Sequence, residues 1–159
     1  MKWSWLLLAC SCASSRPLPD RAALAGVSLA KLDGGSSPIA DLRGRVVLLD
    51  FWATWCEPCK EALPFYAQLQ RELGERGFTV AAVSVDADDA PVRQYFAGSP
   101  PPFLVLRDPD GDVAQRMGVS VMPTSFLLDR AGEPKFRNQG FTAADQQAIR
   151  ARVLSLLDR

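Results

Sequence analysis

Two stretches of the chain are apolar almost without interruption. Residues 46–52 read Val-Val-Leu-Leu-Asp-Phe-Trp, and residues 78–85 read Phe-Thr-Val-Ala-Ala-Val-Ser-Val. A strand with one face in water alternates apolar and polar residues, whereas a strand covered on both faces is apolar throughout. We therefore predict that both stretches are central strands of a sheet that carries helices on each side.

Shorter patterns predict the remaining elements. Thr142 followed by Asp145 fits the capping box that begins a last helix. Two strands around the turn at residues 130–133 predict a hairpin. Residues 26–43 contain Gly and Ser, with a turn at 32–35, and lead into the core. The predicted helices cover residues 56–73, 90–97, 112–117 and 143–157, and the further strands cover residues 103–107, 125–129 and 135–138. This order of strands and helices predicts one α/β domain with a mixed sheet.

Composition removes several functions from consideration. The 159 residues carry 18 basic and 18 acidic side chains and no histidine. Balanced charge without a basic stripe gives no support to nucleic-acid binding. Without histidine the chain has no Ser–His or Cys–His pair and no imidazole ligand for haem or metal. Any proton transfer must use a carboxylate, a thiol, Lys, Tyr or water.

Cys56 and Cys59 stand where the first apolar run gives way to a predicted helix. The attacking species in disulfide exchange is a thiolate, and a helix N-terminus stabilises it through unpaired N–H groups and the helix dipole. Pro58 fits the first helical turn, where a missing N–H costs nothing. We predict that Cys56 is the nucleophile and Cys59 the resolving cysteine. Their redox-active disulfide is then the only redox group required, and we expect no other cofactor.

Two other roles are open for this pair. A structural disulfide is one, although closing so short a loop contributes only about 2 kcal/mol. A zinc site is the other, since Cys-x-x-Cys is half of a common zinc motif. The second half is missing, because the only other cysteines are Cys10 and Cys12 near the N-terminus. Redox exchange is therefore favoured, and no metal site is predicted.

The first residues predict export. Lys2 precedes the apolar residues 3–9, and Cys10 follows. This resembles a bacterial lipoprotein signal, which implies a signal peptide over residues 1–9, cleavage before Cys10 and lipid attachment to Cys10. The segment is far shorter than the roughly 20 apolar residues of a spanning helix. Residues 10–25 are expected to form a tether and residues 26–159 the folded domain. A nonspecific apolar N-terminus, or lipidation at Cys12, is the alternative.

Residues 41–59 and 118–124 resemble the thioredoxin superfamily, and specifically the exported TlpA/ResA-like thiol–disulfide oxidoreductases. The resemblance extends from about Val27 to the C-terminus. It implies a thioredoxin-like three-layer fold, a mixed central sheet flanked by helices. Residues 86–118 resemble the extra strand–helix insert of this group.

The resemblance also implies roles for residues outside the cysteine pair. Met122 and Pro123 match a cis-proline loop beside the cysteines, where the backbone pairs with an extended substrate segment. We therefore predict substrate binding by Met122, Pro123 and Thr124, an ordinary trans proline at a strand start being the alternative.

Asp50 stands six residues before Cys56, inside an apolar strand. It matches the buried aspartate that assists proton transfer at the resolving cysteine of thioredoxin, and burial should raise its pKa. TlpA-like proteins more often carry Asn here and a glutamate where this chain has Ala62, and the lysine that partners the thioredoxin aspartate maps onto Ala82. We predict that Asp50 is the base, acting through water. A purely structural, hydrogen-bonded Asp is the alternative.

Trp55, Glu57 and Pro58 are expected to tune the redox behaviour of the cysteine pair. The Glu57 carboxylate opposes formation of a thiolate at Cys56, which predicts a reductant nearer thioredoxin than a strong oxidant. Trp55 is expected to pack beside the cysteines, as an aromatic of the same kind does in the family.

Together these features predict an enzyme, a thiol–disulfide oxidoreductase that reduces disulfides in extracytoplasmic client proteins. It would lie in the bacterial cell envelope, tethered in the periplasm by a lipid anchor, and a membrane electron donor would re-reduce it. The resemblance points to cytochrome c maturation or related redox assembly. Two alternatives are a peroxiredoxin-like peroxidase, although Ala53 stands where that family has Thr, and a redox-inactive binding module or metallochaperone.

Overall fold

The computed structural model describes residues 17–159. Within this range a mixed sheet has the strand order β2-β1-β5-β4-β3-β6-β7. β3, β4 and β5 are mutually parallel, and the outer pairs β3–β6, β6–β7, β1–β5 and β1–β2 are antiparallel. The strands are β1 (Ser28–Lys31), β2 (Ser36–Pro38), β3 (Val46–Trp52), β4 (Phe78–Ser84), β5 (Leu104–Arg107), β6 (Thr124–Leu128) and β7 (Pro134–Gln139).

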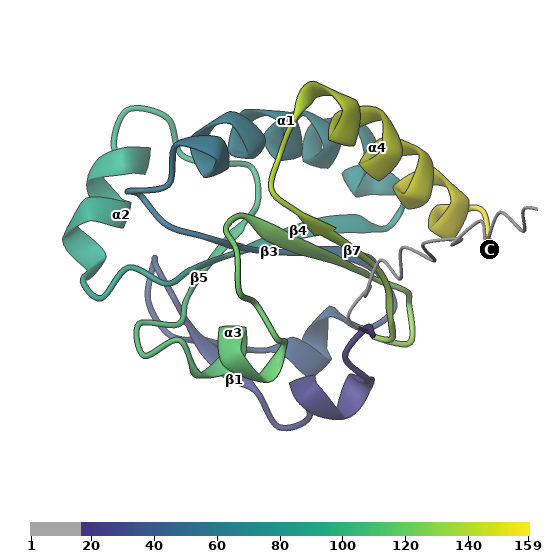
Figure 1. The fold of residues 1–159 in the computed structure, drawn as a ribbon, viewed down its shortest axis with the longest axis horizontal. Helices are drawn as coiled ribbons and strands as arrows, with labels where there is room; N and C mark the ends of the chain where they lie inside the picture. The colour runs from purple at the N-terminus through teal and green to yellow at the C-terminus, as the bar shows by residue number, and fades with distance from the viewer. Residues whose placement is uncertain (1–16) are drawn as a thin grey trace, which may run out of the picture.

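Helices cover both faces of the sheet (Figure 1). α1 and α4 lie on one face, while α3 and the short 3-10 helices η1 and η2 lie on the other. The helices are α1 (Glu57–Leu73), α2 (Asp89–Phe96), α3 (Asp112–Arg116) and α4 (Ala143–Leu157), with 3-10 turns η1 (Arg21–Leu24), η2 (Ile39–Leu42) and η3 (Gly74–Arg76). The three-layer, thioredoxin-like α/β architecture expected from the sequence is confirmed.

The central strand β3 explains why its sequence is apolar throughout. Val46, Leu48 and Trp52 face the core under α1 and α4, whereas Val47 and Phe51 face the core under α3. Successive side chains of a strand point to opposite faces, so a strand in the middle layer must be apolar on both. Every residue of β3 is buried, as predicted.

Most predicted elements occur within one or two residues of their expected bounds. The strand over 46–52 and the helix over 143–157 match fully, and the Thr142–Asp145 capping box is present, with the Thr142 N–H donating to the Asp145 carboxylate at 2.8 Å. Residues 86–118 contain α2, β5 and α3, and β5 joins the sheet between β4 and β1. The insert therefore begins with its helix, and the strand follows.

The structure adds two features to the N-terminal part that the sequence analysis did not predict. Residues 26–43 contain the strands β1 and β2, which short polar sequences did not reveal because Leu29 is the only fully buried residue in either strand. The tether was expected to extend to residue 25, but η1 packs on the domain and buries Leu24 beside Val27 in the core under α3. An apolar side chain placed next to an apolar core is stabilised by leaving water, so the packed domain begins before Gly26.

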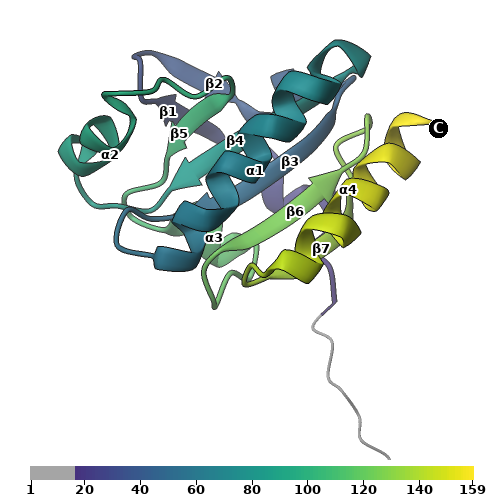
Figure 2. The same ribbon diagram turned by 90° about the horizontal axis from the view of Figure 1, so that it is seen from above.

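None of the helices in residues 17–159 combines the length and the apolar character that crossing a membrane would require. Figure 2 shows the sheet from above, with α1 lying over β3 and β4 and α4 lying over the side of the sheet that carries β6 and β7. The N-terminal end of α1 follows directly from the carboxyl end of β3, which places the candidate site at that edge of the sheet.

Candidate active site

Cys56 and Cys59 form a disulfide at the N-terminus of α1, with their Cα atoms 5.3 Å apart. Cys56 is the N-cap residue, and its sulfur accepts a hydrogen bond from the Cys59 N–H at 3.3 Å. Pro58 lies in the first turn, where no intrahelical N–H bond is lost. The helix end therefore presents an N–H group and the positive end of its dipole to the Cys56 sulfur, the arrangement that stabilises a thiolate.

Both cysteines are buried, and Cys56 is the one that keeps some access to solvent. Cys56 is 6% exposed and Cys59 is 0% exposed, while the adjacent Trp55, which was expected to pack beside the cysteines, is 68% exposed and lies outside the core that contains them. A bulky partner can reach only the outer cysteine. The geometry therefore supports Cys56 as the residue that exchanges with other molecules and Cys59 as the internal partner.

Glu57 projects into solvent beside the disulfide. Its side chain is 79% exposed, and its carboxylate accepts a hydrogen bond from the Lys60 ammonium at 2.7 Å. Opposite charges that lie this close cancel much of each other's field, and water screens the remainder. Lys60 therefore weakens the predicted effect of Glu57, in which its negative charge disfavours a thiolate at Cys56. The sequence analysis did not consider Lys60.

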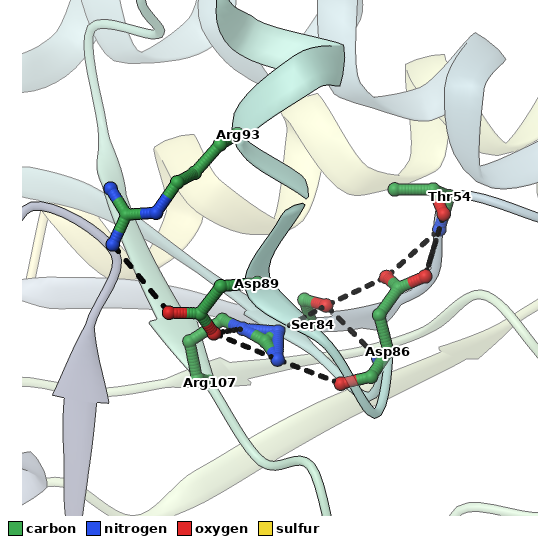
Figure 3. A network of polar contacts seen from close by, with 6 residues as sticks. All are labelled: Thr54, Ser84, Asp86, Asp89, Arg93 and Arg107. Carbon is green, nitrogen blue, oxygen red and sulfur yellow. Dashed lines mark hydrogen bonds and ion pairs between the residues drawn. The ribbon is translucent and has the colours of Figure 1, made fainter. Parts of the chain in front are cut away.

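The loop between β3 and α1 is held by a buried carboxylate at the end of β4 (Figure 3). Asp86 accepts hydrogen bonds from the Thr54 N–H at 3.0 Å and from the Thr54 hydroxyl at 2.6 Å. The Ser84 hydroxyl donates to the same carboxylate at 2.8 Å. Because Thr54 lies two residues before Cys56, these bonds fix the approach of the chain to the first cysteine.

A buried arginine extends this network toward α2. The Arg107 side chain is 3% exposed, donates to the Asp86 carbonyl at 2.8 Å and forms an ion pair with Asp89 at 3.0 Å (Figure 3). Arg93 contacts the same Asp89 carboxylate at 3.5 Å. A buried guanidinium is tolerated only where its charge and donors have partners. The network joins the cysteine loop, β4, β5 and α2, and no motif in the sequence predicted it.

The loop before β6 contains a cis peptide bond between Met122 and Pro123, as the resemblance implied. Thr124 begins β6 beside Phe51, near the end of β3, and its hydroxyl donates to the Val121 carbonyl at 2.6 Å. Met122 packs against the core that contains both cysteines. The structure thus brings the predicted substrate-binding loop to the cysteine pair, while substrate binding itself stays a prediction.

Asp50 lies on the face of β3 that α1 and α4 cover, between Leu48 and Trp52. Its neighbours across the sheet are Ala82 on β4 and Ser125 on β6, so no cation faces it from either strand. The side chain is fully buried, and neither carboxylate oxygen has a hydrogen-bond partner among residues 17–159. Burial raises the pKa of Asp50 well above its ordinary value. A carboxyl group in this state takes up and holds a proton more readily than an exposed aspartate does.

Tyr66 is the residue of this site that sequence reasoning missed. Its hydroxyl is buried, lies close enough to Asp50 and Ser125 to interact with both, and forms no hydrogen bond of standard geometry within the described residues. Burial, and next the charge of Asp50, raises the pKa of Tyr66, so its hydroxyl stays protonated. The available signal was its spacing of seven residues from Cys59, which places both on one face of a helix.

The structure does not test two further predictions, lipid attachment to Cys10 and the absence of a metal site. Cys10, the predicted lipidation site, lies outside the described residues. Within residues 17–159 no group of three or more His, Cys, Asp or Glu side chains is placed to hold a metal ion.

The strand order, the disulfide at the start of α1 and the cis proline before β6 are those of the thioredoxin fold. Within that class the chain belongs to the redoxin family, whose family model matches residues 14–150.

Individual relatives agree with this assignment. A protein named thiol-disulfide oxidoreductase ResA, from Oceanobacillus iheyensis, is 34% identical over 116 residues, which cover 73% of this chain and 60% of that protein. The chain thus matches about three fifths of the length of this relative. A structure described as a putative thiol:disulfide interchange protein DsbE from Chlorobium tepidum is 37% identical, with a TM-score of 0.80 over 88% of this chain and 94% of that one. The exposed lipoprotein thioredoxin Etrx1 from Streptococcus pneumoniae is 27% identical, with a TM-score of 0.71 over 82% and 98% of the two chains.

Proposed function

We propose that this protein is a thiol–disulfide oxidoreductase that reduces disulfides in other proteins. The observation that carries the proposal is the Cys56–Cys59 disulfide, with its outer sulfur at the helix N-terminus and its inner sulfur buried. In the reduced form the Cys56 thiolate attacks one sulfur of a client disulfide, and the other client sulfur leaves as a thiolate. Cys59 then attacks the Cys56 sulfur, releases the second client sulfur and leaves the Cys56–Cys59 disulfide.

The second step needs a deprotonated Cys59, and the Cys59 side chain is buried. Asp50 is the base that we assign to it, because it is buried on the face of β3 that α1 covers and its raised pKa favours proton uptake. A carboxylate of ordinary pKa would be a weak acceptor for a thiol proton. We expect the transfer to pass through water, as the sequence predicted.

The setting of the reaction is also part of the proposal. Export with a lipid anchor on Cys10 is supported by the signal-like N-terminal sequence and by a similar structure that is named an exposed lipoprotein thioredoxin. Clients would then be disulfide-bearing proteins of the bacterial envelope or periplasm, with cytochrome c maturation or related redox assembly as the process. A membrane electron donor of the thiol-reducing pathway would return Cys56 and Cys59 to dithiols.

Insulin reduction tests the chemistry. The wild-type protein with dithiothreitol should accelerate insulin precipitation, and Cys56→Ser should abolish the acceleration. Cys59→Ser should instead accumulate mixed disulfides with its clients, because the resolving thiol is missing. Failure of the wild-type protein to reduce insulin, or activity that survives in Cys56→Ser, would refute the proposal. Consumption of peroxide at a comparable rate would favour the peroxidase alternative.

A glutathione titration of the cysteine pair measures its reduction potential and so tests whether the protein is a reductant. We expect a potential nearer the roughly −270 mV of thioredoxin than the roughly −120 mV of the strong periplasmic oxidant. Neither Glu57 nor Lys60 supplies a strong net charge to the Cys56 sulfur, because the two form an ion pair with each other. A potential close to that of the strong oxidant would contradict this expectation.

A further inference from the structure

One face of α1 is buried along its whole length and contains a single polar side-chain group beyond the cysteine. Cys59, Ala62, Tyr66 and Leu69 follow one another at spacings of three and four residues, and all are fully buried. Residues at these spacings lie above one another on a helix, and their side chains lean toward its N-terminus. The Tyr66 ring therefore leans over Ala62, in the direction of the cysteine pair. Ala62 is small and carries no polar atom.

Asp50 and Tyr66 bring three buried polar atoms into this core. Both Asp50 oxygens and the Tyr66 hydroxyl lack a hydrogen-bond partner within residues 17–159, although the two side chains are close enough to interact. Buried polar atoms in folded proteins are almost always paired, and an exception calls for an explanation. A neutral Asp50 has little need of a donor, whereas an ionised one in a dry core needs one strongly.

We propose that Tyr66 is a positioning residue for Asp50, whose hydroxyl donates a hydrogen bond to the Asp50 carboxylate when that group ionises. The inference rests on the proposed function, because it gives Asp50 the task of accepting the Cys59 proton. With the donor in place, Asp50 gives up its own proton at a lower pH and is ready as a base over a wider range. The hydroxyl of Tyr66 touches neither reacting sulfur.

Few other groups compete for this role. The titratable groups that share this core are Cys56, Cys59 and Tyr95, and Asp145 in the first turn of α4 acts on Tyr66. The residues paired with Asp50 on β4 and β6 are Ala82 and Ser125, and neither is charged. The Ser125 hydroxyl also lies close enough to Tyr66 to interact with it, although no hydrogen bond of standard geometry joins the two. Two buried donors in this core lack a partner within residues 17–159, the Trp52 indole N–H and the Tyr66 hydroxyl. The Tyr66 hydroxyl is the one that interacts with Asp50.

Tyr66→Phe is the variant that tests this role, and Tyr95→Phe is its matched control. The ring of Tyr66 packs on Phe65 and Phe141, and phenylalanine keeps those contacts. Tyr95, the only other tyrosine, packs on Trp52 from α2 and has no part in the proposed proton transfer. Each variant loses one tyrosine hydroxyl group, so a difference between the two variants reports on where that hydroxyl lies.

The measurement is the rate at which Cys59 resolves a preformed mixed disulfide between Cys56 and a chromogenic thiol, followed from pH 5 to 9. In Tyr66→Phe we expect the rising limb of the profile to move to higher pH, with a rate about tenfold lower on that limb, the scale of one hydrogen bond to a charged group. The plateau at high pH should be unchanged, and Tyr95→Phe should follow the wild-type profile.

A second pair of variants separates positioning from general damage. In an Asp50→Asn background, Tyr66→Phe should add no further change to the profile. An unshifted limb in Tyr66→Phe, or an equal loss of rate with and without Asp50, would overturn the inference. The rate at which Cys56 first forms the mixed disulfide is measured separately. Loss of that step in the wild-type protein would refute the proposed function, whereas its presence with an unshifted limb would refute only the role of Tyr66.

Discussion

Asp50 is a carboxyl group in a strand whose other residues are all apolar. Burial without a cation or a hydrogen bond makes its ionised form costly, so the folded protein holds the Asp50 proton more tightly than the unfolded chain does. The stability that this proton contributes is fully present below the unfolded pKa and is lost as pH rises through the raised folded pKa. The residue thus imposes a cost on the folded state at neutral pH, which is consistent with a catalytic task.

Replacing Asp50 with Asn should remove this pH-dependent cost. Asparagine cannot ionise, so we expect Asp50→Asn to be more stable than the wild type at pH 8 by about 1–3 kcal/mol. The difference should shrink as pH falls toward 4. Urea unfolding of the oxidised proteins at several pH values measures it. A stability difference that does not vary with pH would show that Asp50 keeps an ordinary pKa in the folded protein.

At the scale of elements, the cysteine loop depends on contacts with β4, β5 and α2. Asp86 holds Thr54, while Arg107 joins the Asp86 carbonyl to Asp89 at the start of α2 (Figure 3). Each contact lies at the carboxyl ends of parallel strands, where loops from separate parts of the chain meet. The insert is therefore connected to the active-site loop by hydrogen bonds as well as by the sheet.

Loss of the Asp86 carboxylate should loosen this junction. Asp86→Ala leaves the Thr54 N–H and hydroxyl without their acceptor, and we expect a loss of about 2–4 kcal/mol in unfolding free energy. Asp88→Ala is the matched control, because Asp88 is exposed and caps α2 without a side-chain hydrogen bond. Urea unfolding of both variants provides the comparison. Equal stabilities of the two would mean that the network contributes little.

Sequence patterns predicted some elements well and others not at all. β3 and β4 are central and apolar along their length, and α4 has its own capping box, so each is specified by local sequence. β1 and β2 are short strands at one end of the sheet, and their pairing with each other and with β5 depends on residues distant in the sequence. The spacing of apolar residues along a strand does not show which other strand it pairs with. The sequence analysis therefore did not predict β1 and β2.

At the scale of the whole molecule, three separate segments meet at the edge of the sheet that carries the cysteine pair. They are the loop between β3 and α1, the residues that follow β4 and the cis-proline loop before β6. The described chain begins at Pro17, whose carbonyl accepts a hydrogen bond from Arg137 on the edge strand β7. A lipid on Cys10 would hold this domain at a membrane surface while the exposed Trp55 remained available to clients. Anchoring and catalysis should therefore be separable.

Removing the predicted lipid site should change location without changing chemistry. When the protein is produced in a bacterial host with its signal intact, Cys10→Ser should move it from the membrane fraction to the soluble envelope fraction. In the proposed lipoprotein, Cys10 would carry the acyl chains that hold the domain to the bilayer. Purified Cys10→Ser should reduce insulin like the wild type. Cys12→Ser is the control and should stay with membranes; release by this variant alone would place the lipid on Cys12.

The sequence by itself identified the cysteine pair and predicted the layer architecture. Thiolate chemistry at a helix N-terminus depends on neighbours along the chain, and a fully apolar strand indicates its own burial. Only the tertiary structure decided how that pair is supported. Lys60 beside Glu57, Asp86 beneath Thr54 and Tyr66 beside Asp50 are contacts across a helix turn or between elements. The Asp86–Thr54 and Tyr66–Asp50 pairs depend on packing between segments that are apart in the sequence. The spacing of apolar residues does not show which polar side chains such packing will bring together.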